Sequence, residues 1–204
     1  MTQTSGILSK QFLIWVFANV LGFGALGAMH LVFPALIMRF SGLIATIATA
    51  LAISIPISLA QWIALRRILQ TSVLWILTIP IGLLLTVLII RVIPDGLWLV
   101  VDDESIAALT TPYLVFGFII GLLQWLILRR QLLRSSIWLL GSSIGAVAGI
   151  WLILVTDLIN QSGIISYIIA VMVYSIVTGL VLSWLLIYHN QSQTNLATAA
   201  QPQL

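Results

Sequence analysis

Long runs of apolar residues, each closed by a charged residue, a proline or a glycine, dominate the chain. The runs are continuously apolar rather than alternating, which is typical of membrane-spanning helices and not of barrel strands. A helix of about 20 apolar residues is long enough to cross the hydrocarbon layer of a bilayer. The pattern therefore predicts six transmembrane helices, near residues 12–37, 42–65, 71–91, 112–128, 135–156 and 164–188.

Little of the chain remains outside these helices. The tail from His189 to Leu204 is rich in Gln, Asn, Thr and Ala, and we expect it to be disordered because it has almost no apolar surface to bury. The predicted organisation is an all-α integral membrane protein, with a transmembrane domain over residues 1–188 and a polar cytoplasmic tail over residues 189–204. Thr111 and Pro112 are expected to be the cap and the first residue of the fourth helix.

Two sequence markers recur along the chain. The segment Gln61-Trp62-Ile63-Ala64-Leu65-Arg66-Arg67 returns 63 residues later as Gln124-Trp125-Leu126-Ile127-Leu128-Arg129-Arg130, and Ser183-Trp184-Leu185-Leu186-Ile187-Tyr188-His189 is a decayed third copy. A glycine also follows a tryptophan by seven residues three times, at Trp15 and Gly22, Trp75 and Gly82, and Trp138 and Gly145. Both markers predict three parallel repeats of a helical hairpin, over about residues 12–65, 71–128 and 135–188.

The composition of the chain excludes several classes of protein. Apolar residues make up 61% of the chain and charged residues 6%, against roughly 45–50% and 25% in a soluble domain, so a water-soluble fold is excluded. The absence of cysteine excludes disulfides, thiolate metal sites and cysteine nucleophiles. A net charge of +3 without a long basic cluster predicts no nucleic-acid partner.

The distribution of charge predicts the topology. Six of the eight basic residues fall on one side of the six-helix arrangement: Lys10, Arg66, Arg67, Arg129, Arg130 and Arg134. Arg39, Arg91 and all five acidic residues fall on the other side. Because cytoplasmic loops carry an excess of Lys and Arg, both chain ends are predicted to be cytoplasmic.

The repeated Gln-Trp element is the first candidate site. Tryptophan prefers the headgroup level and arginine reaches into the interface, so its spacing favours anchoring of a helix that leaves the bilayer. An alternative is a site for an anionic lipid headgroup, or a cytoplasmic vestibule, girdled by Trp15, Trp75 and Trp138 together with the repeated tryptophans. The candidate residues are Gln61, Trp62, Arg66, Arg67, Gln124, Trp125, Arg129, Arg130, Ser183 and Trp184.

Small residues at four-residue spacing form a second candidate feature. Such ridges let helix backbones approach closely in a membrane, either within the chain or in a homodimer. The residues are Gly117, Gly121, Gly141, Gly145, Gly149, Ser175 and Gly179. No metal site or cofactor is predicted, since His30 is read as a hydrogen-bonded residue near the outer interface and Asp102-Asp103-Glu104 as a solvated acidic turn.

The repeated element, with a tryptophan and a glycine on the adjoining helix, resembles a group of uncharacterised multi-pass membrane proteins of bacteria, particularly cyanobacteria. The resemblance spans about residues 12–188 and departs where Tyr188 and His189 replace the arginine pair. It implies a bacterial inner membrane, with a thylakoid as an option, and no known activity.

Two classes of function remain open. No hydrolytic motif or buried charge is visible, so an enzyme is not predicted. We expect a non-catalytic accessory, assembly or structural component of the membrane, whose partners are lipids, another membrane protein or a second copy of the chain. The alternative is a small transporter or channel for an uncharged or amphipathic solute.

Overall fold

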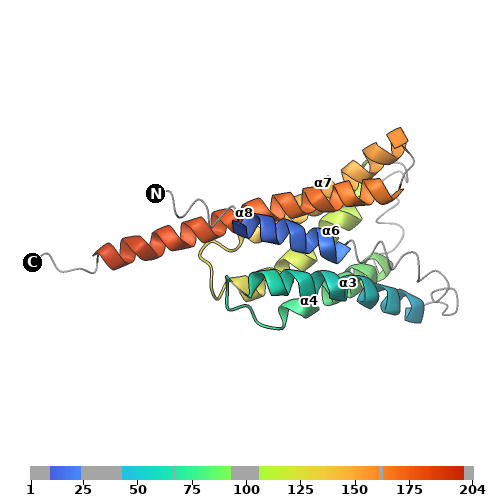
Figure 1. Ribbon diagram of the computed structural model, residues 1–204. Helices are drawn as coiled ribbons and strands as arrows, with labels where there is room; N and C mark the ends of the chain where they lie inside the picture. The colour runs from blue at the N-terminus through green and yellow to red at the C-terminus, as the bar shows by residue number, and fades with distance from the viewer. Residues whose placement is uncertain (1–9, 24–42, 67, 93–105, 161–162, 200–204) are drawn as a thin grey trace, which may run out of the picture.

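A computed structural model of the chain is all-helical, as predicted (Figure 1). The structure describes residues 10–23, 43–66, 68–92, 106–160 and 163–199. The first described helix is Lys10–Phe23. It is followed by α3 (Leu43–Leu65), α4 (Trp75–Val92), α6 (Ile106–Leu128), α7 (Ile137–Asn160) and α8 (Gly163–Ala199).

Three helical stretches of the described residues are long and apolar enough to cross a membrane: Thr110–Leu128, Ile137–Thr156 and Ile168–Thr194. The other apolar stretches in the same part of the chain are shorter, namely Lys10–Phe23, Ser54–Leu65 and Trp75–Thr86. Much of the first predicted span, residues 24–37, lies outside the described residues. Three candidate spans are therefore established, and membrane crossing by the first three helices stays a prediction.

Two helix boundaries differ from expectation. The prediction of a disordered tail after His189 is wrong up to Ala199, because α8 continues through these residues. Extending an existing helix adds one hydrogen bond per residue without a new nucleation step, and residues 189–199 contain no Gly or Pro to stop it. Helix α6 begins at Ile106, before the expected start at Pro112. A proline in the second turn removes a single backbone hydrogen bond and does not end the helix.

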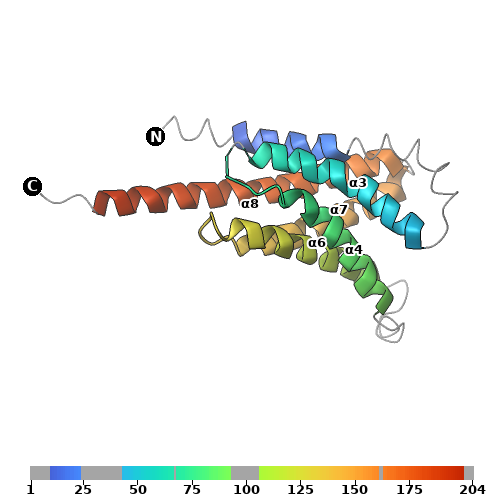
Figure 2. The ribbon, with the colours of Figure 1, turned by 90° about the horizontal axis from the view of Figure 1, so that it is seen from below.

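The two described hairpin turns lie at one end of the bundle, here called the hairpin-turn end (Figures 1 and 2). One turn joins α3 to α4 and the other joins α6 to α7, and α8 projects beyond the bundle at this same end. The two turns have matching hydrogen bonds. Leu69 N donates to Leu65 O at 2.8 Å, and Leu132 N donates to Leu128 O at 2.9 Å, so each helix ends by folding a leucine back into the core.

The described helices form a closed circle in which each contacts the next along the chain. Helix α3 follows the first helix at the crossing of Gly22 and Ile57, and α4, α6, α7 and α8 then follow in order. The circle closes where Gly179 of α8 meets Trp15 and Phe12 of the first helix. Sequence neighbours are thus neighbours in space, which is the usual arrangement of consecutive elements.

Polar side chains are buried and many large apolar side chains are exposed. Asn19, Gln61 and Gln124 are fully buried, whereas Phe17 on the first helix and Leu140 on α7 are each 63% exposed. In lipid, an outward apolar side chain costs nothing and a polar one must find a partner inside the protein. The distribution is the one expected of a membrane-embedded bundle.

Candidate functional site

Amide and indole groups meet in the core near the hairpin-turn end. Gln61 occupies the middle of the arrangement: its Nε2 donates to Asn19 Oδ1 at 2.7 Å. Its Oε1 accepts from Trp75 Nε1 at 3.2 Å and from Gln124 Nε2 at 3.2 Å. Helices α3, α4, α6 and the first helix are therefore joined through one glutamine side chain.

Gln124 repeats the role of Gln61 one hairpin later. Its Oε1 accepts from Trp138 Nε1 at 2.9 Å, and both glutamines bond a tryptophan 14 residues further along the chain. The third indole, Trp15, donates to Thr178 Oγ1 on α8 at 3.0 Å. We call these residues the amide–indole network: Trp15, Asn19, Gln61, Trp75, Gln124, Trp138 and Thr178.

The three indole rings of this network fill the centre of the bundle. The ring centroids of Trp15 and Trp138 lie 5.7 Å apart, and those of Trp75 and Trp138 lie 6.3 Å apart, both edge to face. All three side chains are at most 1% exposed. Leucines from the ends of α3 and α6, from the two turns and from α8 pack around them: Leu65, Leu69, Leu128, Leu132, Leu182, Leu185 and Leu186.

These positions differ from the expected girdle of tryptophans. Trp15, Trp75 and Trp138 lie in the core, as do Gln61 and Gln124, so none of the five side chains faces outward. The reason is pairing: an indole N–H inside an apolar bundle needs an acceptor, and each glutamine oxygen supplies one. The spacing of 14 residues from glutamine to tryptophan, present in both hairpins, is the sequence signal for this pairing.

In the decayed third copy on α8, the buried positions fall one residue earlier than an alignment of Trp184 with Trp62 and Trp125 predicts. Trp184 is 39% exposed, as are Leu126 and Ile63, whereas Trp62 and Trp125 are half-buried. In the pattern of buried positions, Leu182 takes the place that Gln61 and Gln124 hold on α3 and α6. Ser183 is half-buried beside it and lies outside the amide–indole network. Trp15 therefore pairs with Thr178, one helical turn away from Leu182.

An arginine side chain covers an aromatic ring at three places near the hairpin-turn end. Arg66 lies over Trp62 with its Cζ 4.8 Å from the ring centroid, and Arg129 lies over Trp125 at 5.4 Å. Arg134, whose φ is 57°, lies 4.4 Å over Tyr188, which in turn stacks on Trp184. No carboxylate pairs with these guanidinium groups within the described ranges.

The remaining arginines of the repeated element are placed differently. Arg130 is exposed. Arg67 lies outside the described residues.

The small residues predicted to form ridges lie at helix crossings. A Cβ atom on Gly117 would lie 2.8 Å from Ser142 O and 2.9 Å from Ser143 Cα, so α6 and α7 touch backbone to backbone there. Gly121 meets Ser142 as well. Gly141, Gly145 and Gly149 face α8, Gly179 faces the first helix, and Ser175 is fully buried.

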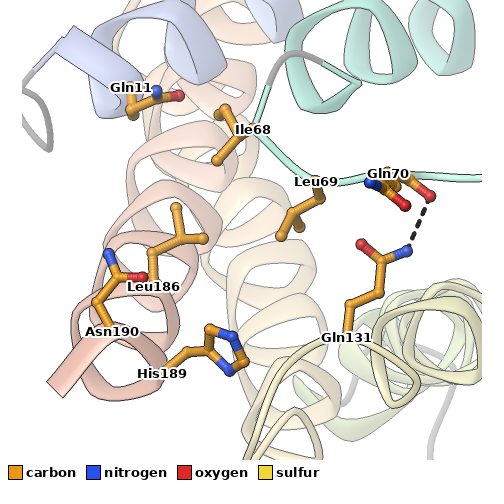
Figure 3. A pocket seen from close by; sticks show the side chains of 8 residues that line it. All are labelled: Gln11, Ile68, Leu69, Gln70, Gln131, Leu186, His189 and Asn190. Atoms are coloured by element: carbon orange, nitrogen blue, oxygen red, sulfur yellow. Dashed lines mark hydrogen bonds between the residues drawn. The ribbon is translucent and has the colours of Figure 1, made fainter. Parts of the chain in front are cut away.

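A pocket of about 370 Å³ opens at the hairpin-turn end, between the start of the first helix, the α3–α4 turn and α8 (Figure 3). Its lining residues are Gln11, Ile68, Leu69, Gln70, Gln131, Leu186, His189 and Asn190. Gln131 Nε2 donates to Gln70 O at 2.9 Å. Gln11 Oε1 and His189 Nδ1 are buried and have no hydrogen-bond partner.

In the described part of the chain, no three His, Asp or Glu side chains gather in a way that could hold a metal ion. His30 and the acidic segment from Asp102 to Glu104 lie outside the described residues. Comparison with protein-family models, curated proteins and solved structures finds no match.

Proposed function

We propose that this protein is a non-catalytic accessory, assembly or structural component of a bacterial membrane. The amide–indole network is the observation that carries the proposal. It joins five of the described helices through Gln61, Gln124 and their partners, and it closes the centre of the bundle with three indole rings. A solute passing along the bundle axis would have to break this packing, so the arrangement favours a fixed scaffold over a transport route.

The proposal includes six spans arranged as three parallel hairpin repeats. Support comes from equivalent roles 63 residues apart: Gln61 and Gln124 bond each other and each binds a tryptophan. Ile57 and Ile120, at the same offset, share a second apolar cluster with Ile79. Three indoles from the first, third and fifth described helices meeting at one point fit a pseudo-threefold axis along the membrane normal.

Anchoring is the role we assign to the outer residues of the repeated element. The guanidinium groups of Arg66 and Arg129 lie over Trp62 and Trp125 at exposed helix ends. An indole at the headgroup level and a cation that reaches the interface hold a helix end at a fixed depth. With both chain ends cytoplasmic, the hairpin-turn end faces the cytoplasm. The resemblance to bacterial proteins suggests the inner membrane, with the thylakoid as the alternative address.

The test separates a scaffold from a transporter. The full chain is purified from native membrane in mild detergent, and its mass is measured for co-purifying protein; a second sample is reconstituted into liposomes. We expect a stable complex, with itself or with another membrane protein. We also expect flux of uncharged solutes such as glycerol and urea to equal that of protein-free liposomes. Saturable flux above that background, from a monodisperse protein without partners, would contradict the proposal and support the transporter.

A further inference from the structure

The pocket at the hairpin-turn end belongs to neither the amide–indole network nor the helix crossings. It lies where α8 leaves the bundle, and its walls come from four separated segments (Figure 3). These are Gln11 on the first helix, residues 68–70 in the α3–α4 turn, Gln131 in the α6–α7 turn, and Leu186, His189 and Asn190 on α8. A volume of about 370 Å³ falls within the range of small-molecule sites, roughly 300–1,000 Å³.

The polar side chains of the pocket have unsatisfied hydrogen-bonding capacity. Gln11 Oε1 is buried without a donor, and His189 Nδ1 is buried without a partner. A buried polar atom left unpaired is costly, and native proteins rarely contain one without a role. Two such atoms come from different helices, and both belong to residues that line one pocket. They indicate a bound group that supplies the missing hydrogen-bond partners.

The lining defines the chemistry of that group. None of the described lining residues is Lys, Arg, Asp or Glu, so the pocket selects neither an anion nor a cation. The amides of Gln11, Gln70, Gln131 and Asn190 each carry both donors and acceptors. Hydroxyl groups are donors and acceptors as well, and Gln11 Oε1 accepts only from an O–H or N–H group. A quaternary ammonium headgroup, which has no such hydrogen, does not satisfy it.

The apolar side of the pocket fits the same ligand. Ile68, Leu69 and Leu186 form one wall, and Leu69 and Leu186 belong to the core cluster that packs under the pocket. A sugar ring has hydroxyl groups around its edge and C–H groups on its faces, so it can bond the amides while it packs on the leucines. We propose that this pocket binds an uncharged, hydroxyl-rich ligand, namely a sugar that is either free or the headgroup of a lipid.

The binding test uses the full chain in an amine-oxide detergent, because sugar detergents would compete for the pocket. The chain has two histidines, so His30→Gln leaves His189 as the single imidazole. Its ¹⁵N resonances are followed while maltose, or octyl glucoside below its micellar concentration, is added. We expect a saturable shift of the His189 signals. A shift with both probes identifies a site for free sugar, and a shift with octyl glucoside alone identifies a lipid-borne sugar.

Variants assign the shift to the pocket. Gln11→Leu removes the unpaired acceptor and is expected to weaken binding about tenfold, as loss of one hydrogen bond does. Leu186→Trp fills the pocket and is expected to abolish binding, which keeps the test informative if Gln11→Leu does not fold. Gln193→Ala, on the exposed side of the same α8 extension, is the matched control and should bind as the parent does.

Three results would overturn the proposal. The first is no saturable shift with either sugar, which would mean that water alone fills the pocket. The second is unchanged affinity in both Gln11→Leu and Leu186→Trp. The third is equal saturation by phosphate or phosphocholine, which would show that the pocket does not select an uncharged ligand. None of these readouts depends on the scaffold role, because sugar binding is measured on the purified chain and partner retention in native membrane.

Discussion

An indole in a membrane protein can be satisfied in two ways, at the headgroup level or by an acceptor inside the bundle. Trp62, Trp125 and Trp184 are partly exposed, and an arginine or another aromatic ring covers each of them. Trp15, Trp75 and Trp138 are buried, and each donates its N–H to a side-chain oxygen. Trp62 Nε1 also has an acceptor, the backbone oxygen of Thr71 at 3.3 Å, so a side-chain acceptor on another helix is what distinguishes the three buried tryptophans.

The contribution of the Gln61 hydrogen bonds to the stability of the fold can be measured. Gln61→Leu removes the acceptor of Trp75 Nε1 and of Gln124 Nε2 and the donor to Asn19. We expect a loss of about 1–3 kcal/mol in the free energy of unfolding, because leaving buried groups unpaired costs that much. Unfolding in mixed micelles is the measurement. Gln193→Leu, at an exposed position, is the control, and equal stability of the two variants would show that the network contributes little.

At the scale of helices, the glycines decide how closely neighbours approach. A Cβ on Gly117 would lie within 3.0 Å of three α7 atoms, and two of them, Ser142 O and Ser143 Cα, are backbone atoms that cannot move aside. Only Ala170 O lies within 3.4 Å of a Cβ on Gly149. Without a hydrophobic force between helices in lipid, such close approach is a main source of packing energy. A methyl group added at Gly117 is therefore expected to lower the stability more than one added at Gly149.

We predict that Gly117→Ala lowers the melting temperature in detergent more than Gly149→Ala does. Overpacking against fixed backbone typically costs about 1–3 kcal/mol. Both substitutions are Gly to Ala in a helix, so the gain in helix propensity cancels in the comparison. Equal melting temperatures would mean that α6 and α7 separate at this crossing without cost.

The ends of the helices were harder to predict than their existence. Helix α3, expected over residues 42–65, runs over Leu43–Leu65, whereas α6 and α8 are longer than expected by one or more turns. Pro112 was expected to begin a helix and the residues after His189 to follow one, but α6 begins before Pro112 and α8 continues past His189. Both segments continue an apolar helix that is already formed, and propagation overrides weak local signals.

At the scale of the whole molecule, the property to test is the topology, that is, which side of the membrane each loop and chain end occupies. We predict that a reporter fused after His189 is cytoplasmic and that one inserted near Asp103 is external. The physical reason is that the proposed six-span arrangement places six basic residues, Lys10 and the arginines of the two turns, on the side opposite to the acidic residues. The described arginines Arg66, Arg129 and Arg134 lie at the hairpin-turn end.

The fusion experiment has its own control. A reporter after Arg134, in the α6–α7 turn, should match the one after His189, because both residues lie at the same end of the bundle. An external signal at either position would remove the proposed six-span arrangement. Asp103 itself lies outside the described residues.

Some features of this protein follow from the sequence by itself. Continuous apolar runs require helices, and the helical class is confirmed by the structure. The recurrence of Gln-Trp with an arginine pair places two chemically equal helix ends 63 residues apart, and both lie at one end of the bundle. Composition alone also excludes a water-soluble fold.

Only the tertiary structure decided which side of each helix faces inward. In a soluble protein the polar face of a helix marks the outside, but in lipid the outer face is as apolar as the inner one, so periodicity carries no such mark. Gln61 was therefore expected at the interface, but its side chain lies in the core. Sequence alignment pairs Trp184 with Trp125, but Leu182 is the residue of α8 that occupies the buried position equivalent to Gln124. The partners across helices, Trp75, Trp138 and Thr178, determine these placements because a buried hydrogen bond has to be completed by another helix.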